Sequence, residues 1–276
     1  MPTRCPTVGD RRNNPGWSLM RRFSLSLSVI VFLIISIILL TLVTYSPLPA
    51  LAASLASPEI QFAILLSLIT STVSTLICIA IAIPVAYSLS RYRFFGKRVV
   101  ELVLTVPLTL PPLVAGIALL LFFGTTPWGK ALDQAGFAAI FTPLGIIVAE
   151  VFVNLPYMIR ILRSSFSTIN PRYEYVAKTL GCTESGAFLR VTLPMARSGL
   201  LAGTVITWSK AMGEFGAVLL LAGATTMRTE TLPIALYLNI SAGDLDLAVA
   251  AATILILISL VTLCAVEYFD RDVHVF

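Results

Sequence analysis

The sequence predicts an all-α membrane protein with six transmembrane helices. Hydrophobic residues make up 57% of its 276 residues and charged residues only 12%, against about 45–50% and about 25% in soluble domains. Six long apolar segments also follow one another along the chain, and a spanning helix needs about 20 such residues. The segments are continuously apolar and do not alternate, which excludes the strands of a membrane barrel.

The six segments define the expected spans and the expected domain boundaries. Their most apolar parts cover residues 25–43, 60–90, 102–123, 139–161, 199–221 and 247–266. The charges inside them are Glu150 and, at the very end, Arg160 in the fourth span, and Lys210 and Glu214 in the fifth. We therefore expect an N-terminal extension over residues 1–22, one membrane domain over 23–269 and a tail over 270–276.

The basic residues predict the orientation. Five Lys or Arg residues precede the first span, and four lie between the second and third. Six lie from Arg160, at the end of the fourth span, to the start of the fifth, whereas the alternate connections hold none, one and one. Because cytoplasmic loops are enriched in Lys and Arg, both termini are expected in the cytoplasm. The bases are spread over several membrane-flanking loops, so their pattern indicates topology and argues against binding of nucleic acid.

The first span has an alternative interpretation. Arg21-Arg22 precedes its apolar run, and Ala50-Leu51-Ala52 resembles a signal-peptide cleavage site. The run is nearer 20 residues than the usual 7–15 of a signal peptide, which favours a retained helix. Cleavage would leave five spans and place the mature N-terminus outside.

No catalytic, metal-binding or cofactor-binding site is predicted in the chain. His274 is its one histidine, and its four cysteines lie far apart. Residues 124–130 fit G-x4-G-K, but Ala131 replaces the Ser or Thr of a phosphate-binding loop and Pro127 removes a backbone donor. ATP hydrolysis is therefore expected on another subunit, and an intramembrane protease is a distant alternative because the sequence has no catalytic Ser-His, paired Asp or HExxH set.

The longest cytoplasmic connection, residues 162–197, is expected to fold as a helix–turn–helix. Asn170 and Pro171 suit the start of a helix, and Gly181 suits a left-handed end. Thr183 can cap a second short helix, and Pro194 leads into the fifth span. The pattern alone leaves two alternatives open: an amphipathic hairpin lying on lipid, or a docking element for a cytoplasmic partner.

This connection resembles the EAA loop of ABC importer permeases. The segment Val176-Ala177-Lys178-Thr179-Leu180-Gly181 is followed after nine residues by Val191-Thr192-Leu193-Pro194, which has the spacing of that loop. Tyr175 stands where the family has Glu, and Glu174 lies one residue earlier. The resemblance implies that six residues couple the chain to an ATPase: Glu174, Tyr175, Ala177, Gly181, Leu193 and Pro194.

A second pair of segments is similar to molybdate-type permeases and their tungstate relatives. These segments are Gly213-Glu214-Phe215-Gly216-Ala217 and residues 106–112, which end in Pro111-Pro112. Sulfate permeases share much of the first segment. The resemblance implies a type I ABC importer permease in the cell membrane, for molybdate or tungstate, with a sulfate or thiosulfate permease as the alternative.

The same resemblance implies the partners. They are a second copy of the chain, two cytoplasmic ATPase subunits that bind ATP and Mg²⁺, an external oxyanion-binding protein and the lipid bilayer. Seven residues are candidates for the translocation path or the dimer axis: Lys210, Gly213, Glu214, Phe215, Gly216, Pro111 and Pro112.

The intramembrane polar residues allow other interpretations. Lys210 and Glu214 have i,i+4 spacing and can form an ion pair, and Glu150 can form a hydrogen bond with Asn154. The glycines of the fifth span, including the Gly199-x3-Gly203 pair, are expected to serve helix packing. A different class of protein also fits: a stand-alone secondary transporter or channel whose relay is Glu150, Lys210 and Glu214.

Overall fold

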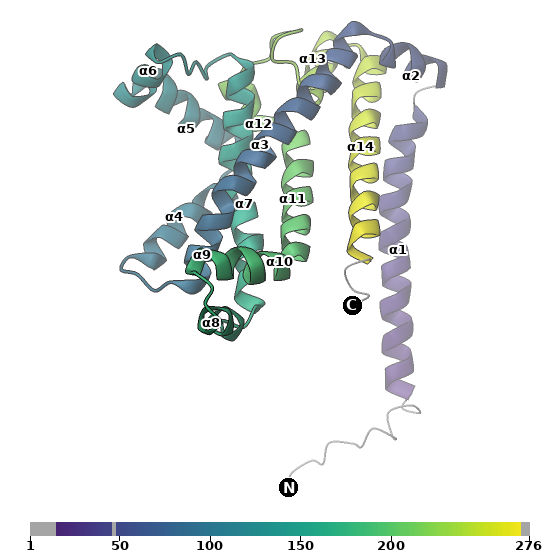
Figure 1. Cartoon of the computed structure of the whole chain (residues 1–276). Helices are drawn as coiled ribbons and strands as arrows, with labels where there is room; N and C mark the ends of the chain where they lie inside the picture. Colours follow the sequence, from purple (N-terminus) through teal and green to yellow (C-terminus); the bar gives the residue numbers. More distant parts are fainter. Residues whose placement is uncertain (1–14, 46–47, 272–276) are drawn as a thin grey trace. The chain divides into compact units, whose positions relative to one another are not determined.

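The computed structural model describes residues 15–45 and 48–271, and its regular structure over these residues is helical (Figure 1). The chain divides into two units, residues 1–47 and residues 48–276. In the first unit, α1 (Pro15–Tyr45) is an apolar helix that begins inside the segment assigned to the N-terminal extension. The rest of that extension, residues 1–14, and the end of the predicted tail, residues 272–276, lie outside the described residues.

The second unit contains the remaining helices. In chain order they are α2 (Leu48–Leu55), α3 (Pro58–Arg91), α4 (Lys97–Thr109), α5 (Pro112–Thr125), α6 (Pro127–Gln134), α7 (Pro143–Thr168), α8 (Arg172–Thr179), α9 (Glu184–Ala187), a π-helical turn (Phe188–Thr192), α10 (Leu193–Met195), α11 (Arg197–Met212), α12 (Gly216–Leu221), α13 (Leu232–Ala242) and α14 (Leu245–Arg271).

Four helices in the described part are long and apolar enough to cross a membrane: α1, α3, α7 and α14. The pair α4–α5 forms a fifth candidate span, bent by 114°. The protein is thus a helical, multi-pass membrane protein. Four of the six predicted spans are continuous helices, and the other two are broken.

The prediction that the third span is one continuous helix over residues 102–123 was wrong. Helix α4 ends at Thr109 and α5 begins at Pro112. Pro111 and Pro112 lack the backbone N–H that a continuing helix needs, and proline disfavours helical geometry in the residue before it. Two successive prolines therefore separate the segment into two helices with different directions.

The prediction that the fifth span is one continuous helix over residues 199–221 was also wrong. Helix α11 has 16 residues and ends at Met212, and α12 begins only at Gly216. Two glycines close to this break favour it, because glycine has the greatest backbone freedom to lose in a helix.

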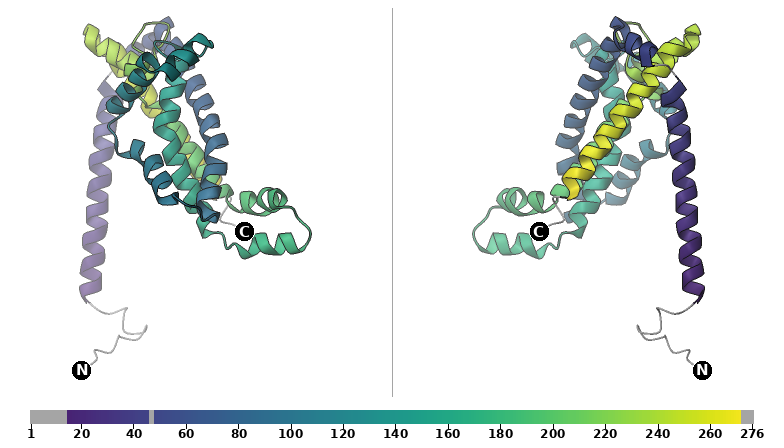
Figure 2. Two further views of the ribbon diagram at one scale, coloured as in Figure 1. Left: turned by 90° about the vertical axis from the view of Figure 1, so that its left-hand side faces the viewer. Right: turned by 90° about the vertical axis from the view of Figure 1, so that its right-hand side faces the viewer.

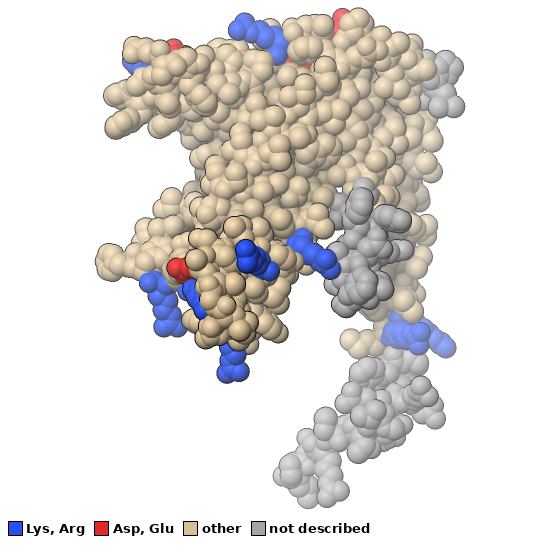
Figure 3. Space-filling model, in the orientation of Figure 1, with Lys and Arg blue, Asp and Glu red and all other residues tan. Residues whose placement is uncertain are grey.

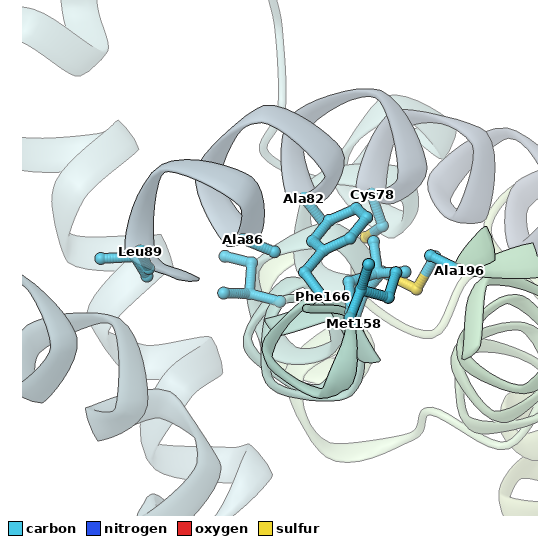
Figure 4. Close-up of a cluster of buried hydrophobic side chains, with 10 residues drawn as sticks. Cys78, Ala82, Ala86, Leu89, Met158, Phe166 and Ala196 are labelled. Atoms are coloured by element: carbon cyan, nitrogen blue, oxygen red, sulfur yellow. The ribbon is translucent and has the colours of Figure 1, made fainter. Parts of the chain in front are cut away.

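Helices α3 and α7 pack extensively against each other, and Figure 4 shows the buried cluster that their side chains form. The side chains of Cys78, Ala82 and Ala86 on α3 are small and fully buried, so α7 can approach and pack Met158 and Phe166 against them. Small residues at such contacts permit close packing of helices in lipid.

Helix α11 packs on both α7 and α3. A methyl group added at Gly199 would collide with the side chain of Ser165, and one added at Gly203 would lie 2.8 Å from the sulfur of Met158. The predicted close contact at the Gly199-x3-Gly203 pair is confirmed, and it fixes α11 against α7.

Candidate functional site

Residues 170–196 form a hairpin of short helices, called the 170–196 hairpin below, between α7 and α11. Figure 2 shows it extending from one end of these helices. Asn170 accepts a hydrogen bond from the backbone N–H of Arg172 (3.0 Å), and Thr183 accepts one from that of Gly186 (3.1 Å). Gly181 makes the turn at φ +91°. The helix–turn–helix follows the local sequence signals, except that α7 extends to Thr168, so residues 162–168 belong to that helix.

Glu174 anchors the hairpin to the end of α3. Its carboxylate accepts hydrogen bonds from the Nε atom of Arg91 (2.8 Å), the hydroxyl of Tyr87 (3.0 Å) and the hydroxyl of Thr192 (2.7 Å). Arg91 also donates to the carbonyl of Ile169 (3.1 Å). The Arg91 and Glu174 side chains are only 9% and 8% exposed. One carboxylate thus joins both arms of the hairpin to α3.

The sequence did not reveal three members of this network: Tyr87, Arg91 and Thr192. Arg91 contributes to the topology signal as one of several loop bases, but its partner lies 83 residues away. Tyr87 also packs its ring against Phe188, with centroids 4.6 Å apart, and against Phe166 of α7 at 6.0 Å. The hairpin is therefore held by apolar as well as charged contacts.

The network also sets the ionisation of Glu174. Burial raises the pKa of this carboxyl, but the hydrogen bonds from Thr192, Tyr87 and Arg91, together with the Arg91 charge, outweigh burial and hold its pKa below the ordinary value of 4.5. The charged, hydrogen-bonded form is the stable one at neutral pH.

This lowered pKa predicts acid-sensitive anchoring of the hairpin. Because the pKa is lower in the folded state than in the unfolded state, the contribution of Glu174 to stability is fully present above about pH 4.5. That contribution is lost as the pH falls through the lowered pKa. Hydrogen exchange of the 170–196 amides, corrected for intrinsic rates, should accelerate in that range. The variant Glu174→Gln should lack this pH dependence, and an equal dependence in the variant would contradict the assignment.

The hairpin exposes apolar side chains beside charged ones such as Arg172, Glu184 and Arg190. The exposed apolar side chains are Tyr173, Tyr175, Val176, Leu180 and Leu189. Of the six predicted coupling residues, Glu174 and Ala177 are buried, Leu193 is half-buried, and Tyr175, Gly181 and Pro194 are exposed. Charged side chains of this unit gather towards its two ends (Figure 3). The hairpin therefore presents aromatic and aliphatic groups at a charged end of the unit.

The predicted path residues come together only in part. Gly216 begins α12 and packs on α5, where an added methyl group would lie 2.9 Å from the Cβ atom of Pro112. Glu214 is buried and accepts a hydrogen bond from the backbone N–H of Ala217 (3.1 Å). Phe215 stacks obliquely on Tyr237, at 5.4 Å between centroids. Pro111 and Gly213 are exposed.

The alternative ion pair between Lys210 and Glu214 is absent from the described structure. Helix α11 ends at Met212, so Glu214 does not lie one helical turn beyond Lys210. The ammonium of Lys210 lies instead over the ring of Tyr157 on α7, 4.2 Å from its centroid. The three charges proposed for a relay therefore do not form a connected chain of ion pairs.

Glu150 does not bond to Asn154 either. One oxygen of Glu150 accepts from the Thr70 hydroxyl on α3 (3.0 Å). Within the described residues, the other oxygen of Glu150 and both polar side-chain atoms of Asn154 have no hydrogen-bond partner. The two side chains are almost completely buried, so neither lies on an open path in this subunit.

The G-x4-G-K segment is a connection between two helices. Residues 124–130 span the end of α5 and the start of α6, where Thr126 caps α6 by accepting a hydrogen bond from Gly129 (3.1 Å). A Cβ atom at Gly129 would collide with the backbone at Phe122 and Phe123. The glycine serves close packing, and the strand–loop–helix context of a phosphate-binding loop is missing here.

The sequence is similar to those of known membrane transport proteins. Residues 78–275 match the family described as binding-protein-dependent transport system inner membrane component. The chain is 37% identical, over 76% of its length and 80% of the relative, to the molybdenum transport system permease protein ModB of Mycobacterium bovis. It is 29% identical, over 94% of both chains, to the sulfate transport system permease protein CysT of Salmonella typhimurium.

A solved structure shows the same fold. A chain of a bacterial alginate ABC transporter in complex with an alginate pentasaccharide-bound periplasmic protein superposes with a TM-score of 0.72 at 18% identity, covering 93% of this chain and 97% of that one. The relatives above are named as permease proteins of transport systems. This chain therefore belongs to the family of binding-protein-dependent transport system inner membrane components, as an ABC importer permease of the ModB type.

Proposed function

We propose that the chain forms the membrane path of an ATP-driven oxyanion importer and that the 170–196 hairpin couples this path to cytoplasmic ATPase subunits. The anchored hairpin is the observation that supports the proposal. Its outward face carries exposed apolar groups such as Leu180 and Tyr175, and its inner side is bonded to α3 through Glu174 and Arg91. A movement imposed on the exposed face would pass to α3, α7 and α11, shifting the subunit between discrete states.

In this assembly the hairpin and both termini lie in the cytoplasm. Two copies of the chain bind two ATPase subunits, which hold ATP and Mg²⁺, and an external binding protein delivers the oxyanion. Lys210, Pro111, Pro112 and the 213–216 segment lie at the path or the dimer axis. Few bases line any such path, so affinity and selectivity reside in the binding protein, and the conduit binds weakly enough to release its cargo.

Molybdate or tungstate is the proposed substrate. Support comes from the higher identity to the molybdenum transport permease, 37% over 76% of this chain, than to the sulfate permease, 29% over 94%. The longer coverage of the sulfate permease makes sulfate or thiosulfate the second candidate.

The substrate test measures ATP hydrolysis in proteoliposomes. The full chain is reconstituted with its ATPase and with binding protein that is empty or loaded with molybdate, tungstate or sulfate. We expect hydrolysis to be stimulated most by molybdate- or tungstate-loaded protein. Strongest stimulation by sulfate would support the second candidate. Transport by the chain without an ATPase, collapsing with the proton gradient, would overturn the importer proposal.

Leu180→Asp tests the proposed docking surface in the same assay. Leu180 is 80% exposed, so the charge should leave the fold intact. At the centre of a docking surface it should weaken ATPase association by about 2 kcal/mol or more, as loss of a hot-spot side chain does. Phe95→Asp, at an exposed position outside the hairpin, should retain association. Unchanged ATPase binding by Leu180→Asp would contradict the proposed docking face.

A further inference from the structure

A cavity of about 650 Å³ lies between α3, α5 and α7, and all the side chains that line it are apolar. Ile77 comes from α3, Ala118 and Phe122 from α5, and Val148 and Phe152 from α7. The volume is in the range of small-molecule sites. A cavity without polar groups offers nothing to a hydrated oxyanion, so it is not part of an anion path.

The apolar cavity adjoins a second, smaller one that includes two charged side chains. The second cavity has a volume of about 210 Å³ and is lined in part by Lys130 and Asp133 of α6. Phe123 and Phe137 line both cavities, and their ring centroids are 6.3 Å apart. The two spaces therefore share a wall of two aromatic rings, with apolar groups on one side and a charge of each sign on the other.

Helix α6 has the features of a membrane-interface segment. Trp128 is 76% exposed, and Lys130 and Asp133 are exposed on the same short helix. Tryptophan is enriched at the level of lipid headgroups. Lys130 forms no ion pair within 4.0 Å in the described part of the chain, so its ammonium is available to an anionic group.

We propose that these two cavities bind one phospholipid with a zwitterionic, ethanolamine-type headgroup. One acyl chain occupies the apolar cavity between α5 and α7, and the headgroup lies at α6. Lys130 pairs with the phosphate, and Asp133 accepts hydrogen bonds from the headgroup ammonium. The bound lipid holds α5, the second half of the bent pair, against α7. The inference requires only that the chain crosses a bilayer, so it does not depend on the transported substrate.

The test uses the full chain in vesicles of phosphatidylcholine and phosphatidylethanolamine. The probe is a phosphatidylethanolamine with a diazirine in its acyl chain, and labelled peptides are mapped by mass spectrometry after illumination. We expect labelling to concentrate on residues 112–125 and 143–155. The matching phosphatidylcholine probe, which lacks ammonium hydrogens, should label these peptides several-fold less.

Cavity-filling and headgroup variants make the test specific. Ala118→Phe, or Val148→Phe if the first variant folds poorly, should reduce labelling of both peptides several-fold. Lys130→Gln should reduce labelling by both probes, and Asp133→Asn by the ethanolamine probe alone. Leu260→Phe, on the exposed face of α14, is the matched control and should change nothing.

Two results would overturn the proposal. The first is even labelling of all apolar helices that Ala118→Phe does not alter, which would indicate bulk lipid only. The second uses a photoreactive amino acid at position 152. Its cross-linking to residues 15–45 of the same chain, or to a second copy, in place of lipid would assign the cavity to a protein contact.

Discussion

Glu174→Ala is expected to detach the 170–196 hairpin from α3. The substitution removes three hydrogen bonds and leaves the buried guanidinium of Arg91 without its carboxylate. Removing one partner of a buried ion pair costs about 3–5 kcal/mol. Amide exchange throughout the hairpin should accelerate strongly, and ATPase activity should no longer respond to loaded binding protein.

Two comparisons distinguish this anchor from an ordinary surface charge. Glu184→Ala is the matched control, because Glu184 lies on the same hairpin and its contacts, with Lys178 (3.3 Å) and the hydroxyl of Tyr92 (3.1 Å), are exposed at the surface. An exposed pair of this kind contributes about 0–1 kcal/mol. The double variant Arg91→Ala/Glu174→Ala should lose less stability than the two single variants added together. Equal exchange in Glu184→Ala and Glu174→Ala would show that Glu174 is not the anchor.

Gly216→Leu should produce the second large effect, a loss of about 3 kcal/mol from overpacking between α12 and α5. Even a single methyl group at this position would lie 2.9–3.2 Å from atoms of Pro112 and Leu113, two of them in the backbone. The expected result is a lower midpoint of thermal unfolding and a lower yield in the membrane.

Gly213→Leu is the control for this prediction. Gly213 is exposed, and an added methyl group there would meet backbone atoms no closer than 3.8 Å. Its thermal midpoint should remain near that of the parent chain. If Gly216→Leu keeps full stability and loses only transport, Gly216 faces the path and does not serve packing.

The sequence predicts those parts of the fold that depend on composition and on local signals. Apolar runs locate α1, α3, α7 and α14, and the hairpin follows from side chains that act within a few residues, such as Asn170, Gly181 and Thr183. The prolines at positions 111 and 112 also indicate a break, but they do not give its direction. Length and hydropathy favoured one continuous helix there, and local backbone chemistry decided against it.

The remaining features depend on contacts between distant residues. Nothing near Glu174 indicates that its charge is neutralised by Arg91, because the pairing exists only after α3 packs against α7. For Lys210 and Glu214, the sequence predicts an ion pair that the structure does not contain. Their spacing predicts a pair only on an uninterrupted helix, and the chain leaves the helix between them.

The π-helical turn at Phe188–Thr192 limits how the hairpin can be exchanged between related chains. The backbone N–H of Leu193 bonds to the carbonyl of Phe188, five residues earlier, and the turn leads to Thr192, which donates to Glu174. If the same number of residues were wound as a regular α-helix, the side chains that follow would be rotated by about 100°. A chimeric permease with a hairpin from a relative lacking this turn would align well in sequence yet point its threonine away from the anchor. Successful grafts should therefore carry residues 188–192 together with both helical arms.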